Sequence, residues 1–488
     1  MPGDPRAREL CAAALHRARS QPDVSHVEVR WLREKNERLR VRDGAPDGIS
    51  RGGSAGFSIR LIAKGAWGFA CTQAGTETSL GRMVDEAIAV ARASSRLLVK
   101  PVRFPERAGE IGEYASEVEV EPFSVPLEQK LADLAGPEAE LRRGGKPIHS
   151  TEAWMHWTEI DKLLVTSEGT DVAQRLMFGG AGMSAIAVGS DGRMQRRSYP
   201  GFPGSEGLQG GYEIVARTDL LGAAPRVRAE AIELLAAEPC PEGVRDVVLG
   251  SNQMALQIHE SCGHPTELDR ALGAEISLAG GSFLQPSDLG KLRYGSDIVT
   301  LTADSVAPMG LGTFGWDDEG TPAGKVPLVE QGVFVDYLSS RETAAALGRE
   351  STGTVRADGW NRVPMIRMVN VSLEPRSGTL EDLIADTADG ILLDVNQSWS
   401  IDDLRLNFQF SCELAWEIKH GKRVRLLRDA RYTGITPKFW QSCDAICGAA
   451  DTRIWGLMLC GKGDPIQTMA VAHAAPPARF RKVEVGHT

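Results

Sequence analysis

The stretch that decides how this chain is organised is DVVLGSNQMALQIHESCGHPTELD, residues 246–269. Its opening run VVL predicts a buried strand. A turn at Gly250 follows, and the apolar residues of NQMALQI predict an amphipathic helix. Because the helix ends at His259 and Glu260, it places an imidazole and a carboxylate side by side at its end.

The spacing of the two histidines in this stretch departs from a simple helical pair. His264 follows His259 by five residues, so the two side chains would lie about 140° apart on a regular helix, against about 40° for a spacing of four. Gly263 permits a left-handed exit, and a residue that precedes a proline, here Pro265, is disfavoured in helical backbone. We therefore expect His264 to leave the helix and fold back toward His259. From spacing alone, the alternative of a helix-end cap at His259 and a surface turn at His264 stays open.

The residue patterns before this stretch predict a mixture of helices and strands. Residues 6–20 and 79–95 carry apolar side chains at helical spacing. The alternating residues of 26–42 predict a strand, and those of 52–72 predict a hairpin that turns at Lys64-Gly65.

A domain boundary is expected after residue 236. Glycine and proline are densest at 199–213, and a helical segment then runs to the breaker PCPEG. Beyond it, short strand patterns such as DIVTLTAD and VFVDYLSS dominate. We expect an α+β fold, with an N-terminal α/β-sheet domain over residues 1–236 and a β-dominated C-terminal domain over 237–488 that carries the candidate metal site.

Charge and hydropathy exclude several classes of partner. The 488 residues carry a net charge of -10, which repels phosphate backbones and anionic lipid surfaces. No apolar run approaches the roughly 18 residues that span a bilayer, and the first 20 residues lack a hydrophobic signal region. We expect a cytoplasmic protein that binds neither nucleic acid nor membrane, with its eight cysteines present as thiols.

HESCGHPTELD resembles the HExxGHxxExD segment of TldD/PmbA-type metallopeptidases. Further similar features occur in the family's order: the hairpin of residues 52–72, the SEG turn at 167–169, WDDEGTPAGKVPLVEQGVFVDYLSSRETA at 316–344 and LMLCGKGDP at 457–465. The chain is therefore identified as a member of the TldD/PmbA family. One departure is WSIDDLRLNFQFSCELAWEI, residues 399–418, which carries charged residues where the family usually has a glycine-containing loop.

The resemblance implies a zinc metalloprotease. His259, His264 and Cys460 are the implied zinc ligands, and Glu260 is the implied general base. Three protein ligands leave one tetrahedral position for water. Zinc lowers the pKa of that water to roughly 7, and the carboxylate can then take its proton.

Neighbouring residues offer further candidates around the metal. Glu267 and Asp269 match acidic positions of the family motif and could fix the histidine tautomers by accepting imidazole hydrogen bonds, or else be solvated carboxylates. Cys262 is a competing thiolate ligand, ranked behind Cys460 because it can equally face the core. The acidic run at 317–319 is expected to bind substrate or to be structural.

The expected activity is hydrolysis of unfolded or modified peptides by a metal-activated water. The family's active site lies in a chamber formed by a dimer, so the resemblance implies a homodimer or a heterodimer with a family member. Two alternatives stay open: a non-catalytic partner subunit, and a zinc amidohydrolase that acts on non-peptide amides.

Overall fold

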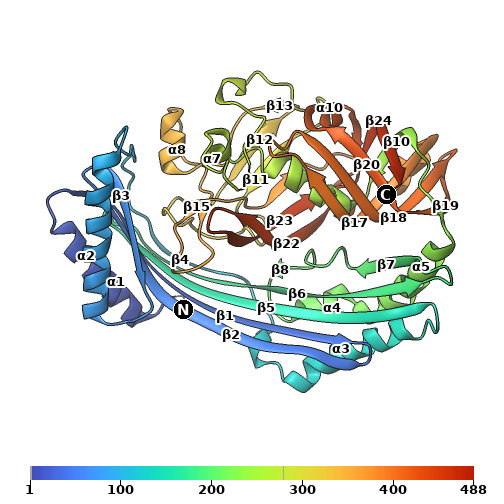
Figure 1. Cartoon of the computed structure of the whole chain (residues 1–488), viewed down its shortest axis with the longest axis horizontal. Coiled ribbons are helices and arrows are strands. Elements are labelled where there is room, and N and C mark those ends of the chain that lie inside the picture. Colours follow the sequence, from blue (N-terminus) through green and yellow to red (C-terminus); the bar gives the residue numbers. More distant parts are fainter. Residues whose placement is uncertain (1–2, 279, 488) are drawn as a thin grey trace.

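The computed structural model describes residues 3–278 and 280–487, and within them the chain forms two large sheets (Figure 1). The first sheet has the strand order β3-β2-β1-β5-β6-β4, with β7 and β8 also paired to β6. The elements of this half are α1 (Pro5–Arg19), β1 (Val24–Arg42), β2 (Ala45–Ala63), β3 (Ala66–Thr72), α2 (Glu77–Ser94), β4 (Ile111–Ala115), α3 (Leu127–Arg142), β5 (Ile148–Thr166), β6 (Asp171–Val188), β7 (Met194–Tyr199), β8 (Leu208–Gln209), α4 (Glu213–Thr218) and α5 (Leu220–Ala236).

The long strands of the first sheet curve beneath the C-terminal half (Figure 1). β2 and β3 pair antiparallel from Phe57↔Thr72 to Ala63↔Ala66, which confirms the expected hairpin. Its two turn residues, Lys64 and Gly65, both have positive φ, of 51° and 76°, as a two-residue turn of type I′ requires. Helices α1 and α2 pack at one end of the sheet, and α3 and α5 pack toward the other.

The second sheet closes on itself. Its order is β17-β10-β24-β20-β18-β19-β9, and β17 pairs with β18 as well as with β10, which closes a ring of five strands. The elements of this half are β9 (Glu238–Pro239), β10 (Gly243–Leu249), α6 (Ser251–Ile258), the π-helical turn η3 (His259–Gly263), α7 (Leu268–Ala271), β11 (Leu301–Asp304), β12 (Lys325–Glu330), β13 (Val333–Phe334), α8 (Arg341–Ala346), β14 (Val355–Arg356), β15 (Met365–Ile366), β16 (Val371–Leu373), α9 (Leu380–Ala385), β17 (Asp389–Ile401), β18 (Asn407–Lys419), β19 (Lys422–Arg428), β20 (Ala430–Ile435), α10 (Thr436–Gln441), β21 (Cys443–Ile446), β22 (Arg453–Lys462), β23 (Gln467–Ala475) and β24 (Ala478–His487).

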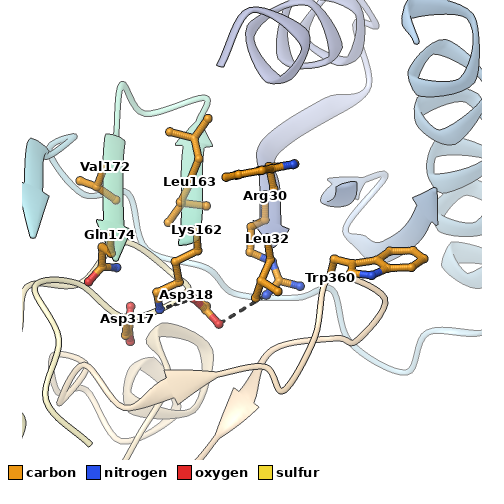
Figure 2. Close-up of a pocket in the computed structure, with 11 residues that line it drawn as sticks. Arg30, Leu32, Lys162, Leu163, Val172, Gln174, Asp317, Asp318 and Trp360 are labelled. Atoms are coloured by element: carbon orange, nitrogen blue, oxygen red, sulfur yellow. Dashed lines mark hydrogen bonds and ion pairs between the residues drawn. The ribbon is translucent and has the colours of Figure 1, made fainter. Parts of the chain in front are cut away.

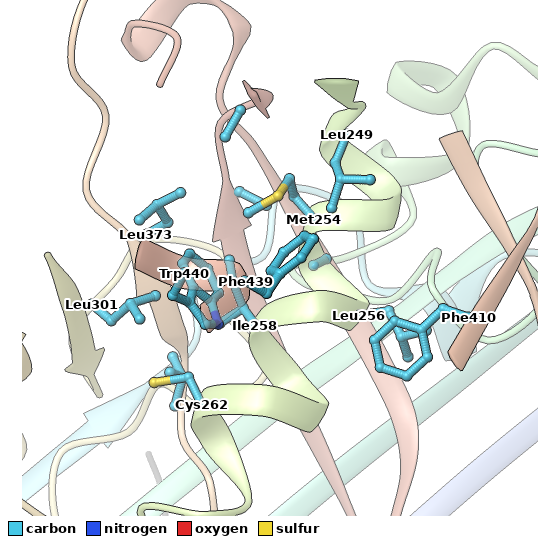
Figure 3. Packing of buried hydrophobic residues seen from close by; sticks show 14 of the residues in the cluster. Leu249, Met254, Leu256, Ile258, Cys262, Leu301, Leu373, Phe410, Phe439 and Trp440 are labelled. Carbon is cyan, nitrogen blue, oxygen red and sulfur yellow. The ribbon is translucent and has the colours of Figure 1, made fainter. Parts of the chain in front are cut away.

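Helix α6 lies in the core of the C-terminal half, and Figure 3 shows Met254, Leu256 and Ile258 among the aromatic rings of neighbouring elements. Every residue from Asn252 to Ile258 is buried. The polar side chains of this helix are paired: Gln253 donates to the hydroxyl of Tyr432 at 2.9 Å, and that hydroxyl donates to Gln257 at 2.9 Å. These hydrogen bonds connect the buried helix to β20, which makes it a rigid support for the residues at its C-terminal end.

The α+β fold class is confirmed, with a sheet and packed helices first and a β-rich half second. The expected boundary after residue 236 falls between α5 and β9, and we retain this division as a proposal. None of the described helices is long and apolar enough to cross a membrane.

Candidate metal centre

Three buried side chains converge at the end of α6. His259, His264 and Cys460 each offer one ligand atom, and these atoms all lie within 4.8 Å of one another. The imidazole rings of the two histidines are 4.7 Å apart between centroids. His264 Nε2 lies 3.9 Å from the sulfur of Cys460. The structure thus brings together the three side chains that the family resemblance names as ligands, although two of them are 196 residues apart in sequence.

The two histidines meet by a route different from the expected one. His264 does not leave the helix: its backbone is helical, with φ -64° and ψ -46°, despite Pro265 behind it. The helix instead widens into the π-helical turn η3, in which the amide of His264 donates to the carbonyl of His259 at 3.1 Å. Because a π turn bonds residues five apart, it stacks side chains of that spacing on one face. The expected fold-back at Gly263 was wrong, and the spacing of five is accommodated by the wider turn.

Cys460 comes from the hairpin of β22 and β23, which carries a register shift between Leu457 and Cys460. Such bulges re-aim side chains near functional sites. Burial alone would raise the pKa of Cys460, but His264 and Arg367 hold it below its ordinary value. Burial raises the pKa of the other seven thiols of the chain. Since the thiolate is the form that binds metals, Cys460 is the thiol best suited to be a ligand.

The two imidazoles are also in the form that a metal needs. Burial lowers the pKa of His259 to about 4 and also lowers the pKa of His264. Both rings are therefore neutral near pH 7, and a neutral imidazole has a lone pair to offer.

Glu267 and Asp269 have different surroundings. Glu267 Oε2 lies 3.0 Å from Nδ1 of His264 and accepts from Nε of Arg270 at 2.6 Å. Asp269 instead accepts from Nζ of Lys462 at 2.7 Å. Burial would raise the pKa of Glu267, but Lys462 and Arg270 hold it well below its ordinary value. Glu267 is thus the carboxylate that contacts a candidate ligand, while Asp269 contacts Lys462 and the backbone amide of Arg270.

Cys262 lies outside the group of ligand atoms, among the apolar side chains of the core (Figure 3). It is fully buried, and burial raises its pKa. Its position between the two histidines in sequence therefore does not bring it into the group of candidate ligand atoms.

Glu260 is buried beside His259, and Nη1 of Arg405 lies 3.6 Å from its Oε2. Arg405 belongs to the charged segment of residues 399–418 and has a positive φ of 65°. Backbone strain of this kind is retained where the surroundings hold it, commonly near functional sites. Sequence reasoning noted the unusual charge of this segment but did not single out Arg405.

Sequence reasoning also missed His473. Its Nε2 lies 2.9 Å from Nδ1 of His259. No motif or spacing points to it, since it lies on β23 and 214 residues from its partner. Only the pairing of β22 with β23, which also delivers Cys460, brings it to the site.

Comparison with known proteins identifies the family of the chain. The family model for the PmbA/TldA metallopeptidase C-terminal domain matches residues 242–487, and the model for domain 1 of the same family matches residues 27–91. The chain belongs to the TldD/PmbA metallopeptidase family. The C-terminal match contains His259, Glu260, His264 and Cys460, so the whole cluster lies in the metallopeptidase domain.

Individual TldD/PmbA relatives are similar over most of their length. A metalloprotease of Methanocaldococcus jannaschii is 27% identical over 414 residues, which cover 84% of this chain and 86% of the relative. A zinc metalloprotease TldD homolog of Saccharolobus solfataricus is 22% identical, over 90% of this chain and 91% of its own. The names of these relatives and the His/His/Cys cluster together support a metallopeptidase with a metal at this site.

Two solved structures share the fold. A Thermotoga maritima protein, described as a candidate modulator of a DNA gyrase, has a TM-score of 0.79 at 18% identity, covering 98% of this chain and all of its own. TldE of Thermococcus kodakarensis has a TM-score of 0.70 at 18% identity, covering 99% of this chain and all of its own. At these identities the likeness shows the fold alone.

Proposed function

We propose that this protein is a zinc-dependent protease that hydrolyses unfolded or modified peptides, with His259, His264 and Cys460 as the metal ligands. The observation that carries the proposal is the convergence of their three ligand atoms within 4.8 Å, beside the carboxylate of Glu260. Two neutral imidazoles and one thiolate suit zinc, and three protein ligands leave a position open for chemistry.

Bound zinc would supply a water made acidic enough to lose its proton near neutral pH, and would polarise the scissile carbonyl. The chain's own residues move the proton. Glu260 accepts it from the water at a carboxylate oxygen and then gives it to the leaving amine nitrogen, as a general base and general acid in turn. Arg405, whose Nη1 lies 3.6 Å from Oε2 of Glu260, positions this side chain for both transfers.

A groove between the first sheet and the hairpin of β22 and β23 supports an extended peptide as the substrate. Its lining includes Trp154 of β5, Pro203 and the consecutive residues Met458 and Leu459 of β22. Leu459 directly precedes Cys460 and is 75% exposed. An apolar side chain held in water next to the candidate ligand offers a contact for an apolar side chain of a peptide.

Metal content is the first test. The purified parent protein should contain about one zinc per chain, and Cys460→Ala should lose most of it because the thiolate is a ligand. Elemental analysis and chelator competition measure this. If the parent binds no metal after zinc is supplied, the proposed protease activity is contradicted. The alternative of a non-catalytic partner subunit would then be favoured.

Glu260→Gln tests the chemistry separately from metal binding. The variant should keep its zinc and lose about 100-fold or more of the rate, since general base catalysis contributes that much. Labelled unfolded peptides and non-peptide amides should be assayed in parallel. Turnover of the amides alone would favour an amidohydrolase, and undiminished peptide cleavage by Glu260→Gln would exclude this mechanism.

Membership of the TldD/PmbA family supports assembly with a family member, and we propose a homodimer or a heterodimer. The molecular mass in solution, measured with and without a co-expressed family member, distinguishes the two. A monomer under both conditions would contradict the proposal.

A further inference from the structure

His473 packs against the ring of His259 and is not one of the three candidate ligands. It is fully buried on β23. Its Nε2 is 2.9 Å from Nδ1 of His259, and its own Nδ1 is 2.6 Å from the carbonyl oxygen of Val371 on β16. The rings of His259 and His473 are nearly perpendicular, at 82°. Three groups from three elements thus form one short hydrogen-bonded chain.

The positions of the protons along this chain follow from chemistry. A carbonyl oxygen can only accept, so the contact with Val371 requires a hydrogen on Nδ1 of His473. In a neutral imidazole the other nitrogen is then an acceptor. The contact with His259 therefore requires a hydrogen on Nδ1 of His259, and its Nε2 is left bare. The lone pair of that nitrogen is the one with which His259 can bind a metal.

The second histidine ligand is oriented in a comparable way by a different group. Nδ1 of His264 faces the carboxylate of Glu267 at 3.0 Å, and Nη2 of Arg270, which is paired with that carboxylate, lies 3.2 Å from the same nitrogen. Nε2 of His264 faces Cys460. Both ligands thus use Nδ1 for support and Nε2 for the site. The difference is that His264 is supported by a carboxylate and His259 by a neutral imidazole, which fixes a tautomer without adding negative charge.

We propose that His473 is a positioning residue for the metal centre, which holds His259 in the Nδ1–H tautomer and turns its bare Nε2 toward His264 and Cys460. The hairpin of β22 and β23 then has two roles, because it supplies one ligand and orients another. β16 fixes the far end of the chain through Val371, and the adjacent bridge between Asn370 and Ala472 holds β16 against β23. Outer partners of this kind typically change metal affinity 10- to 100-fold.

Two substitutions of His473, to Gln and to Asn, distinguish a role in orienting His259 from a role in core packing. The amide of Gln in His473→Gln extends to the place of Nε2 and can still accept from His259. The amide of Asn in His473→Asn is one methylene shorter, so it reaches Val371 but falls short of His259. We expect His473→Asn to weaken zinc binding about 10-fold, and His473→Gln to stay within about threefold of the parent. Ser372→Ala is the control, since Ser372 accepts from the amide of Ala474 beside the histidine and touches neither imidazole.

Zinc affinity, measured by competition with a chromophoric chelator, is the first readout. The absorption of the Co²⁺-loaded protein is the second, because its thiolate-to-cobalt band reports whether Cys460 remains bound. Retained affinity in His473→Asn would overturn the inference, and so would an equal loss in both variants, which would make the residue a packing element. The inference rests on the proposed metal centre. If the parent itself binds no zinc, the metal centre is contradicted, and this result is distinguishable from a parent that binds zinc and a His473→Asn variant that binds it equally well.

A measurement on the unaltered protein covers the case in which a variant does not fold. Nitrogen chemical shifts of ¹⁵N-histidine distinguish a protonated from a bare ring nitrogen. In the metal-free parent, His259 and His473 should both carry their hydrogen on Nδ1. A hydrogen on Nε2 of His259 would contradict the proposal.

Discussion

Two cysteines near the site show how surroundings decide chemistry at the scale of single residues. Cys262 and Cys460 are both buried, at 0% and 3% exposure. Burial alone makes a thiolate costly. Cys460 has His264 and Arg367 beside it, and Arg367 also donates to its carbonyl, whereas Cys262 lies among apolar side chains. The thiol between the two histidines in sequence is therefore the inert one.

Cys262→Ala should leave the metal content unchanged. The substitution removes only a buried sulfur, so the free energy of unfolding should fall by about 1 kcal/mol, close to the value of one buried methylene. Zinc analysis and urea denaturation, with Cys460→Ala alongside, measure both quantities. Loss of zinc in Cys262→Ala would make Cys262 a ligand after all.

Glu267→Gln should be more damaging than Asp269→Asn. Glu267 is fully buried and contacts Arg270, Lys462 and His264, so the neutral variant leaves buried cations without their carboxylate, which typically costs about 3–5 kcal/mol. Asp269→Asn leaves Lys462 paired with Glu267. Thermal unfolding and zinc affinity of the two variants should rank in that order, and equal effects would show that the contact with His264 is unimportant.

At the scale of elements, the π-helical turn η3 is what allows a spacing of five to work. α6 is regular up to Ile258, and the turn that follows is held from outside: Tyr294 donates to the carbonyl of Ser261, and Trp440 donates to its hydroxyl at 2.9 Å. Gly263 ends this turn against Met368, where an added Cβ would come within 2.0 Å of the sulfur. Glycine is therefore needed here because Met368 approaches its backbone closely. A left-handed backbone is not the reason, since φ of Gly263 is not positive.

Gly263→Ala should destabilise the protein by about 1–3 kcal/mol through overpacking and weaken zinc binding by displacing η3. Met368→Ala makes room for the new methyl group, so the double variant should be more stable than the sum of the single effects predicts. Gly136→Ala is the control, because nothing lies within 4 Å of its added Cβ. Additive effects of Gly263→Ala and Met368→Ala, measured by urea denaturation, would show that the methyl group does not meet Met368.

At the scale of the whole molecule, the two halves are joined by buried ion pairs. Figure 2 shows Arg30 and Lys162, from β1 and β5, on either side of Asp318. Arg60 of β2 similarly pairs with Glu28 and with Glu319 of the C-terminal half. The acidic run 317–319, for which the sequence left a substrate-binding or a structural role open, thus contacts cations of the first sheet. These contacts favour the structural role.

Glu28 should make the stability of the protein depend on acid pH. Burial would raise its pKa, but Arg60 and His26 lower it to about 2, below the value of about 4.3 for an unfolded glutamate. The folded state therefore binds fewer protons, so the stabilisation is complete above about pH 4.3 and is lost as the pH falls toward 2. The difference in unfolding free energy between the parent and Glu28→Gln should accordingly shrink over that range.

Urea denaturation at a series of pH values measures this difference. The exposed Glu86→Gln is the control and should stay within about 0.5 kcal/mol of the parent throughout. A difference for Glu28→Gln that does not change with pH would mean that the carboxylate is not held ionised by its neighbours.

The sequence by itself determined what depends on neighbours along the chain. The hairpin at Lys64-Gly65, the strand and helix that lead to His259, and the α+β class follow from residue alternation, helical period and turn chemistry, which act over a few residues. The resemblance of HESCGHPTELD and LMLCGKGDP to the TldD/PmbA family indicated the candidate ligands, and the structure brings these side chains together.

Only the tertiary structure decided how these residues meet. The π turn depends on Tyr294, Trp440 and Met368, which lie far along the chain from His259. His473 contacts His259, and Arg405 contacts Glu260, across more than a hundred residues of sequence. Contacts between residues so far apart produce no periodic pattern in the sequence. Such contacts are set by the closing of the second sheet and by the pairing of β22 with β23, and the energy of a hydrogen bond depends on distance and angle rather than on position along the chain. The sequence therefore supplies the chemical groups, and the packing of the β-rich half decides which nitrogen, oxygen and sulfur atoms face one another.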